Sequence, residues 1–352
     1  MKTYYKALGL LLLPLSLSAT PFAAEDDGLG GIEKKRTIIK MYDVDGSDKL
    51  LLDNQFGQVK VDLWDKSEIR VQIVVTATSN TEDRAQDYLN SVEIVDKRDG
   101  DQISLRTNIQ KQSSNWNWSS GNGNGDKNNV RIDYTVQMPR NNALTVRNRF
   151  GNTHVATFRA PLNIYTRYGN FTAEQLTGSQ NDIDVAYGNA DIHTMDNGKL
   201  EIAYSNLDLE KANVLVLNNK FGKLKIGEVG KLNADISYSG ARIGTLRESC
   251  KMKLAFSGGF RIDQLKSADN VDIQASYSSV ALPLGPENGY DFDVSVTYGG
   301  FNYPNGQNLL FTTQPSDNHS SPGKSKQYIG KIGRGSGPRV RVVSKFGDVS
   351  FR

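Results

Sequence analysis

Three histidines, His154, His193 and His319, are the side chains besides the carboxylates that could act as a general base near neutral pH. None of them stands in a serine-hydrolase, zinc-protease, phosphate-loop or EF-hand motif. The single cysteine, Cys250, excludes an internal disulfide and every cysteine-rich metal site. The sequence therefore predicts a protein that is not an enzyme and needs no cofactor.

One of these histidines shares a repeating pattern with four carboxylates. Residues 17 or 19 positions apart fall into two polar columns that contain Glu174, Asp191, His193, Asp208 and Glu210. If the repeats stack, these side chains lie outward on three adjacent repeats and offer the mixed nitrogen and oxygen ligands of a divalent-cation site. The other interpretation is a solvated acidic face, whose charge Lys211 and Lys225 offset.

Two tryptophans lie in a polar stretch that has no apolar partner nearby. Trp116 and Trp118 belong to the segment KQSSNWNWSSGNGNGDKNN at 111–129. In such a segment they are candidates for contacts with a carbohydrate or a protein partner, unless they fold back onto the neighbouring domain. The segment itself is predicted to be a flexible insertion.

An internal sequence repeat indicates the fold that would position these residues. An aromatic residue followed by Gly or Ser recurs through the chain, at Phe56, Phe150, Tyr168, Tyr187, Tyr204, Phe221, Tyr238, Phe256, Tyr277, Tyr298 and Phe346. From Phe150 to Tyr298 the spacings are 18, 19, 17, 17, 17, 18, 21 and 21 residues. This regularity indicates about nine or more consecutive repeats, each called a coil below.

Each coil has the pattern of a strand, a corner and a second strand. The residues six, four and two positions before the aromatic are mostly apolar, as in Leu232, Ala234 and Ile236, and such alternation predicts a half-buried strand. By the same parity the aromatic residues are predicted to face inward as a buried ladder. If the corner turned them outward, the rings would form a platform for sugars or peptides.

No single coil can bury its apolar face, so stacking of coils is required. The fold class predicted is all-β, a parallel β-solenoid or β-helix with coils of 17–21 residues. Its open ends need covers, which we expect in an N-terminal cap with a short helix and a C-terminal pair of capping strands. The predicted ranges are a signal peptide at 1–24, the cap at 25–140 with its helix at 81–89 and insertion at 111–129, repeats at 141–301, a second flexible insertion at 302–330 and capping strands at 331–352.

The first 24 residues have the features of a secretory signal peptide. Lys2 and Lys6 precede an apolar run from Ala7 to Leu17, which is too short to span a bilayer. No cysteine lies near the cleavage site, so a lipid anchor is not expected, and no later segment is apolar enough to cross a membrane. The protein is therefore predicted to be exported to the periplasm or the cell surface.

The charge balance excludes one class of partner. The formal net charge is +3, and removal of the signal peptide with its two lysines lowers it to +1. A chain so nearly neutral is not expected to bind nucleic acid or to attract any strong polyanion through its overall charge. The partner is unknown from the sequence, with an envelope protein or a glycan as the open alternatives.

The chain resembles the putative adhesin family of bacterial β-strand-repeat domains, which is common in the Bacteroidetes. The resemblance covers most of the mature chain. It lies in the helix-bearing N-terminal part, in the MPR at 138–140 that leads into LTVRNRFGNTHV, in the aromatic corners and in the C-terminal YIGKIGRGSGPRVRVVSKFGDVSF. Many members carry Asn-Gly at the corner, where this chain has Phe or Tyr before Gly or Ser. The resemblance implies an exported scaffold and brings no catalytic residues.

Two functions follow from these observations. The first is a non-enzymatic, adhesin-like scaffold of the envelope or cell surface that presents a long β face. The alternative is a carbohydrate-active β-helix enzyme, a lyase or hydrolase acting on polysaccharide. Such an enzyme needs clustered carboxylates, or a cation with a basic residue, in a groove. The outward columns are mixed in charge, which favours the scaffold.

Overall fold

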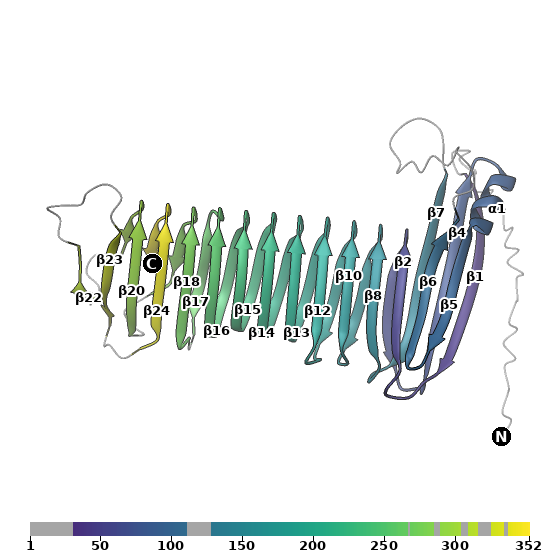
Figure 1. Ribbon diagram of the computed structural model, residues 1–352, viewed down its shortest axis with the longest axis horizontal. Helices are drawn as coiled ribbons and strands as arrows, with labels where there is room; N and C mark the ends of the chain where they lie inside the picture. Colours follow the sequence, from purple (N-terminus) through teal and green to yellow (C-terminus); the bar gives the residue numbers. More distant parts are fainter. Residues whose placement is uncertain are drawn as a thin grey trace, which may run out of the picture.

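The computed structural model describes residues 31–110, 128–266, 268–284, 289–303, 309–315, 325–333 and 337–352. Most of these residues lie in β-strands, and the strands form one hydrogen-bonded sheet of 25 strands. The molecule is an elongated rod in which the strands lie side by side across the long axis (Figure 1). No helix in the described ranges is long and apolar enough to cross a membrane.

The middle of the rod is a stack of coils. Its strands are β8 (Ala143–Arg149), β9 (Thr153–Phe158), β10 (Leu162–Arg167), β11 (Phe171–Leu176), β12 (Asn181–Ala186), β13 (Asn189–Ala203), β14 (Asn206–Lys220), β15 (Lys223–Ser237), β16 (Gly240–Ala255), β17 (Phe260–Leu265), β18 (Asn270–Ser276) and β19 (Val280–Leu282). Successive coils pair in parallel and in register, so that Ile164 lies between Val146 and Ile183. From β13 to β16 the second strand of one coil continues into the first strand of the next.

The predicted inward positions form the core. Leu144, Val146 and Val185 are fully buried or nearly so, and one apolar cluster runs from Val44 to Phe351. Cys250 belongs to the same inward set and is buried, and its burial raises the pKa of the thiol to about 12. Burial of this apolar surface is what a single coil could not achieve alone.

The N-terminal end is covered by antiparallel strands and one helix. Its elements are β1 (Ile32–Asp43), β2 (Lys49–Gln55), β3 (Val59–Trp64), β4 (Glu68–Ser79), α1 (Glu82–Ser91), β5 (Val92–Asp99), β6 (Gln102–Ile109) and β7 (Asn129–Pro139). Strands β2 and β3 form a coil on β8 and β9, so the stack begins inside the predicted cap. Strands β6 and β7 follow in parallel, then β5 and β4 pair with them antiparallel and β1 pairs with β4. The helix expected at 81–89 is α1, whose first turn Thr81 caps by accepting from the Arg84 N–H.

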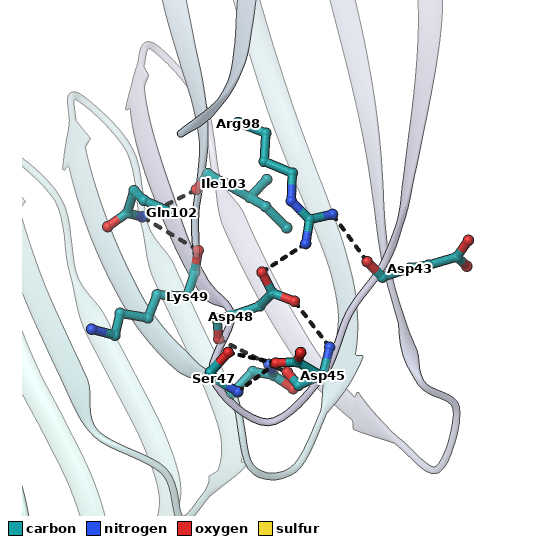
Figure 2. Close-up of polar contacts among 9 residues, drawn as sticks. Asp43, Asp45, Ser47, Asp48, Lys49, Arg98, Gln102 and Ile103 are labelled. Carbon is teal, nitrogen blue, oxygen red and sulfur yellow. Dashed lines mark hydrogen bonds and ion pairs between the residues drawn. The ribbon is translucent and has the colours of Figure 1, made fainter. Parts of the chain in front are cut away.

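Asp48, whose carboxylate is buried, links the N-terminal cap to the stack. Asp48 accepts hydrogen bonds from Arg98 Nη2 at 2.8 Å and from the Asp45 N–H at 2.9 Å, while Arg98 Nη1 donates to the Asp43 carbonyl (Figure 2). Asn142, at the start of the next coil, donates to the carbonyl of Asp48 at 2.8 Å. The side chain of Asp48 thus joins the β1–β2 turn to β5, and the backbone carbonyl of Asp48 joins that turn to the stack.

The C-terminal strands do not form the predicted pair of capping strands. The elements are β20 (Tyr290–Thr297), β21 (Phe301–Asn302), β22 (Leu309–Thr313), β23 (Lys326–Ile332), β24 (Arg339–Lys345) and β25 (Val349–Phe351). Strand β24 lies between β18 and β20, and β25 lies between β19 and β21, so the chain end forms an internal coil (Figure 1). The end is covered by β23 and β22, which pair antiparallel beyond β20. The described part of 302–330, expected to be a flexible insertion, therefore includes β22 and most of β23.

Candidate functional site

The corners have a backbone conformation that reverses the predicted direction of the rings. Among the described residues, the non-glycine residues with positive φ are the eleven corner aromatics, with φ between 51° and 63°. One residue in the left-handed region breaks the alternation of the strand. The prediction of a buried ladder is therefore wrong, because ten of the eleven rings are between 41 and 60 % exposed.

The rings form one continuous stack along the rod, called the ring row below. Its order is Phe56, Phe150, Tyr168, Tyr187, Tyr204, Phe221, Tyr238, Phe256, Tyr277, Phe346 and Tyr298. Neighbouring centroids are 4.6 to 5.1 Å apart and the planes differ by 3 to 9°. At the ordinary strand spacing of about 4.8 Å the ring row extends over about 48 Å. Phe346 lies between Tyr277 and Tyr298 in the row because β24 lies inside the stack.

Stacking decides which part of each ring a partner can contact. Each ring between two neighbours has its faces covered, so it offers its edge to solvent. Ring edges carry the positive part of the quadrupole and favour electron-rich groups. Six of the rings are tyrosines, and from Tyr204 to Tyr298 they alternate strictly with phenylalanines along the row. Even where two tyrosines are adjacent in the row, their hydroxyls are about one strand spacing apart, which is too far for a hydrogen bond between them.

Buried polar side chains form hydrogen bonds with the backbone of the corners. Asn148, fully buried two residues before its ring, donates from Nδ2 to the carbonyls of Gly57 at 3.0 Å and Gly151 at 3.1 Å. In other coils a serine after the ring has this role. Ser205 Oγ donates to the Ala203 carbonyl at 2.8 Å and accepts from the Gly188 N–H at 3.1 Å. These bonds satisfy backbone groups that the corner would otherwise leave unpaired.

A second row of polar side chains runs beside the rings from Asn152 to Lys223, two residues after each ring. Asn170 Oδ1 accepts from the Asn189 N–H at 3.0 Å, and Asn189 Oδ1 accepts from Asn206 Nδ2 at 3.0 Å. Part of this row lines an open groove of about 630 Å³ over β13 to β17. It is lined by Asn189, Ala190, Asp191, Asn206, Leu207, Asp208, Lys223, Leu224, Lys225, Gly240, Ala241, Arg242, Gly259 and Arg261.

The five residues considered for a cation lie on one face, where two of them contact each other and a third pairs with a lysine. Asp191 is opposite Asp208 in the register, as the repeat predicted. His193 Nδ1 contacts the Glu210 carboxylate, and Lys225 Nζ lies 2.8 Å from Asp208 Oδ2. Glu174 is exposed on the neighbouring coil. Over the described ranges, no three His, Cys, Asp or Glu side chains are arranged to hold a metal ion.

The remaining candidates are placed as follows. His154 Nδ1 lies 2.8 Å from Thr172 Oγ1 on the next coil, which gives this outward histidine an ordinary surface contact. Trp116, Trp118 and His319 lie outside the described residues. Sequence reasoning predicted buried rings and gave the exposed direction of the ring row only as the alternative. The signal that could have revealed it is the Asn-Gly corner of the family the chain resembles, because Asn and Gly favour the left-handed region.

No protein-family model matches the chain, and no curated protein matches it in sequence. Among solved structures, a putative cell adhesion protein from Clostridium sporogenes is 12 % identical, with 90 % of this chain and 99 % of that chain covered and a TM-score of 0.21. A putative adhesin from Bacteroides fragilis is 11 % identical over 90 % of this chain and 97 % of that chain, with a TM-score of 0.32. A putative adhesin from Parabacteroides merdae is 12 % identical over 71 % and 97 %, with a TM-score of 0.38.

Proposed function

We propose that the protein is an exported, non-enzymatic β-solenoid scaffold that binds an extended partner of the cell envelope, a protein or a glycan, along the ring row. Export rests on the signal-peptide features of residues 1–24. The solenoid rests on the parallel, in-register pairing of successive coils. The observation that carries the binding function is the exposure of the rings.

The exposed aromatic area is larger than a monomer normally leaves in water. Ten rings are each about half exposed. With roughly 200 Å² for each aromatic side chain, they present on the order of 1,000 Å² in one stripe. The largest apolar patch of a typical soluble monomer is about 300–600 Å², and a stable interface buries about 800 Å² on each partner. The stripe therefore has the size of a binding surface.

Stability alone gives a weak reason for this arrangement. A non-glycine residue in the left-handed region costs about 1–3 kcal/mol, whereas a stacked aromatic pair contributes about 0.5–1.5 kcal/mol. The two terms offset each other at best, and glycine or asparagine would remove the cost. Eleven aromatic residues at these positions are better explained by what their edges contact.

The alternative function, a carbohydrate-active enzyme, has less support from the groove. Catalytic carboxylates need surroundings that exclude water and shift their pKa values. The carboxylate of Asp208 lies in an open groove and is paired with Lys225, whose side chain is 65 % exposed. A solvated ion pair of this kind favours a binding surface over a catalytic one.

The test compares two matched triple variants in binding to envelope extracts and to a glycan array. Tyr187→Asn, Tyr204→Asn and Tyr238→Asn remove three rings, and asparagine tolerates the left-handed backbone. Val214→Asn, Val216→Asn and Val95→Asn remove three other exposed apolar side chains. We expect the ring variant to lose binding at least about tenfold and the control to keep it. Equal binding by both variants would refute the proposed function.

A further inference from the structure

The groove beside the ring row changes charge along its length. Asp191 and Asp208 line its N-terminal half, and four cations line the rest, namely Lys223, Lys225, Arg242 and Arg261. Asp208 pairs with Lys225, and Asp263 forms ion pairs with Arg242 at 2.5 Å and with Arg261 at 3.2 Å. In the described part of the chain Lys223 Nζ has no carboxylate partner. Four cations therefore face the three carboxylates of Asp191, Asp208 and Asp263, which leaves a surplus of one positive charge.

Glycines open this basic segment toward the rings. The row of side chains that follows the ring row is Asn or Lys from Asn152 to Lys223, but it is Gly240 and Gly258 beside Tyr238 and Phe256. A Cβ at Gly258 or at Gly259 would meet no atom within 4 Å, and one at Gly240 would meet only a carbonyl at 3.9 Å. The glycines therefore leave open space beside these two rings, next to the groove that the cations line. A negatively charged group has room there.

The regular spacing of the site indicates the kind of ligand. An aromatic ring recurs at each coil in the ring row, and an asparagine recurs beside it from Asn152 to Asn206, at intervals of about 4.8 Å. A receptor that repeats one contact fits a ligand that repeats one unit. The backbone groups of β13 to β16 are used in pairing between coils, so this face has no open strand edge to bind the main chain of a peptide.

We infer that the partner is a linear acidic polysaccharide lying along the ring row, with its carboxylate or sulfate groups at the segment formed by Lys223, Lys225, Arg242 and Arg261. This inference rests on the proposed function and names the class of its ligand. Sugar hydroxyls bond the tyrosine hydroxyls and asparagine amides, and the electron-rich sugar oxygens contact the ring edges. The charged groups set the position along the rod.

Calorimetry with three linear acidic glycans, polygalacturonate, alginate and hyaluronate, tests the inference. Fully methyl-esterified polygalacturonate keeps the backbone of the first and removes its charge. We expect at least one acidic glycan to bind at low ionic strength. For polygalacturonate, if it is the binder, the ester should bind at least about tenfold more weakly. The variant Lys223→Gln with Arg242→Gln should weaken binding about tenfold. The control Lys251→Gln with Lys253→Gln removes the same charge from another exposed part of β16 and should bind like the wild type.

Three outcomes would overturn the inference. They are no binding of any acidic glycan, equal weakening by the two double variants, or equally tight binding of poly-glutamate, which would mean that charge alone is recognised. The ring variant with Tyr187, Tyr204 and Tyr238 replaced separates the two proposals. If that variant loses envelope binding while no acidic glycan binds, the ring row is a binding surface for another ligand and only the present inference fails.

Discussion

A single backbone angle decides where each ring points. Tyr187 has φ of 59°, and this left-handed turn brings its side chain out of the strand alternation and onto the surface. The parity rule that correctly placed Val185 inside therefore fails two residues later. Aromatic residues rarely adopt this conformation, so the residue types at the corner gave no warning of it.

The strain at one corner can be measured by two substitutions that both remove the ring. Tyr187→Asn should change the free energy of unfolding by about 1 kcal/mol or less, because lost stacking is offset by a backbone that asparagine tolerates. Tyr187→Val should destabilise by about 1–2 kcal/mol more, because a β-branched residue is costly at positive φ. Denaturant unfolding of both variants gives the comparison, and equal stabilities would contradict the role of the backbone.

Two buried groups predict how stability depends on alkaline pH. Burial raises the pKa of the Cys250 thiol from 9.0 to about 12 and that of the Tyr134 hydroxyl from 10.0 to about 12. The folded state holds both groups protonated, so their contribution is complete below pH 9 and is lost as the pH rises toward 12. Unfolding midpoints should therefore fall over this range, and less so in Cys250→Ala. Rapid labelling of the native thiol by a water-soluble maleimide at pH 8 would contradict its burial.

At the scale of elements, alternation within each strand was predictable and the order of strands was not. Leu232, Ala234 and Ile236 are all buried, as their spacing predicted. The unit around Phe346 has the same pattern as every other coil, so it fits anywhere in the stack, and its place between β18 and β20 depends on the long connection through β22 and β23. A sequence pattern that repeats fixes the shape of a coil and leaves its position open.

The inward and outward assignment has a matched test on β13. Ile202 is 1 % exposed and lies between Val185 and Asn219 on the adjacent coils, so Ile202→Asp would bury an unpaired charge. We expect a loss of about 3 kcal/mol or more in the free energy of unfolding. The neighbouring Glu201→Lys should cost about 1 kcal/mol or less, since Glu201 pairs with Lys199 at the surface. Similar losses in thermal or chemical unfolding would reverse the assignment.

The carboxylate of Asp48 is predicted to stabilise the N-terminal cap, although Asp48 lies in a turn. Asp48→Ala removes the acceptor of Arg98 and of the Asp45 N–H, and leaves these donors without it. We expect about 1–3 kcal/mol of destabilisation. Hydrogen exchange should show it as faster exchange in β1 and β5, with the coils near β14 unchanged. Uniform acceleration along the whole rod would mean that the cap does not open separately.

For the whole molecule, the sequence identified the repeat, the all-β class and the need for covers at both ends. The continuous ring row, however, becomes visible only once the left-handed corners and the internal position of β24 are known. Eleven stacked rings expose their edges along one side of the rod. We propose that this side is where the protein meets its partner. Among the candidate cation residues that sequence spacing singled out, His193 contacts Glu210 and Asp208 pairs with Lys225, and cation binding there stays a prediction.

The most direct test of the ring row is site-specific photo-crosslinking in intact envelopes. A benzoylphenylalanine at Tyr204 or Tyr238 replaces one aromatic residue by another at the same corner, whereas the same group at Val216 probes the exposed strand face of β14. We expect a defined crosslinked product, protein or glycan, from both ring positions and none from Val216. Equal products from all three positions, or products from Val216 alone, would contradict the assignment of the ring row as the binding surface.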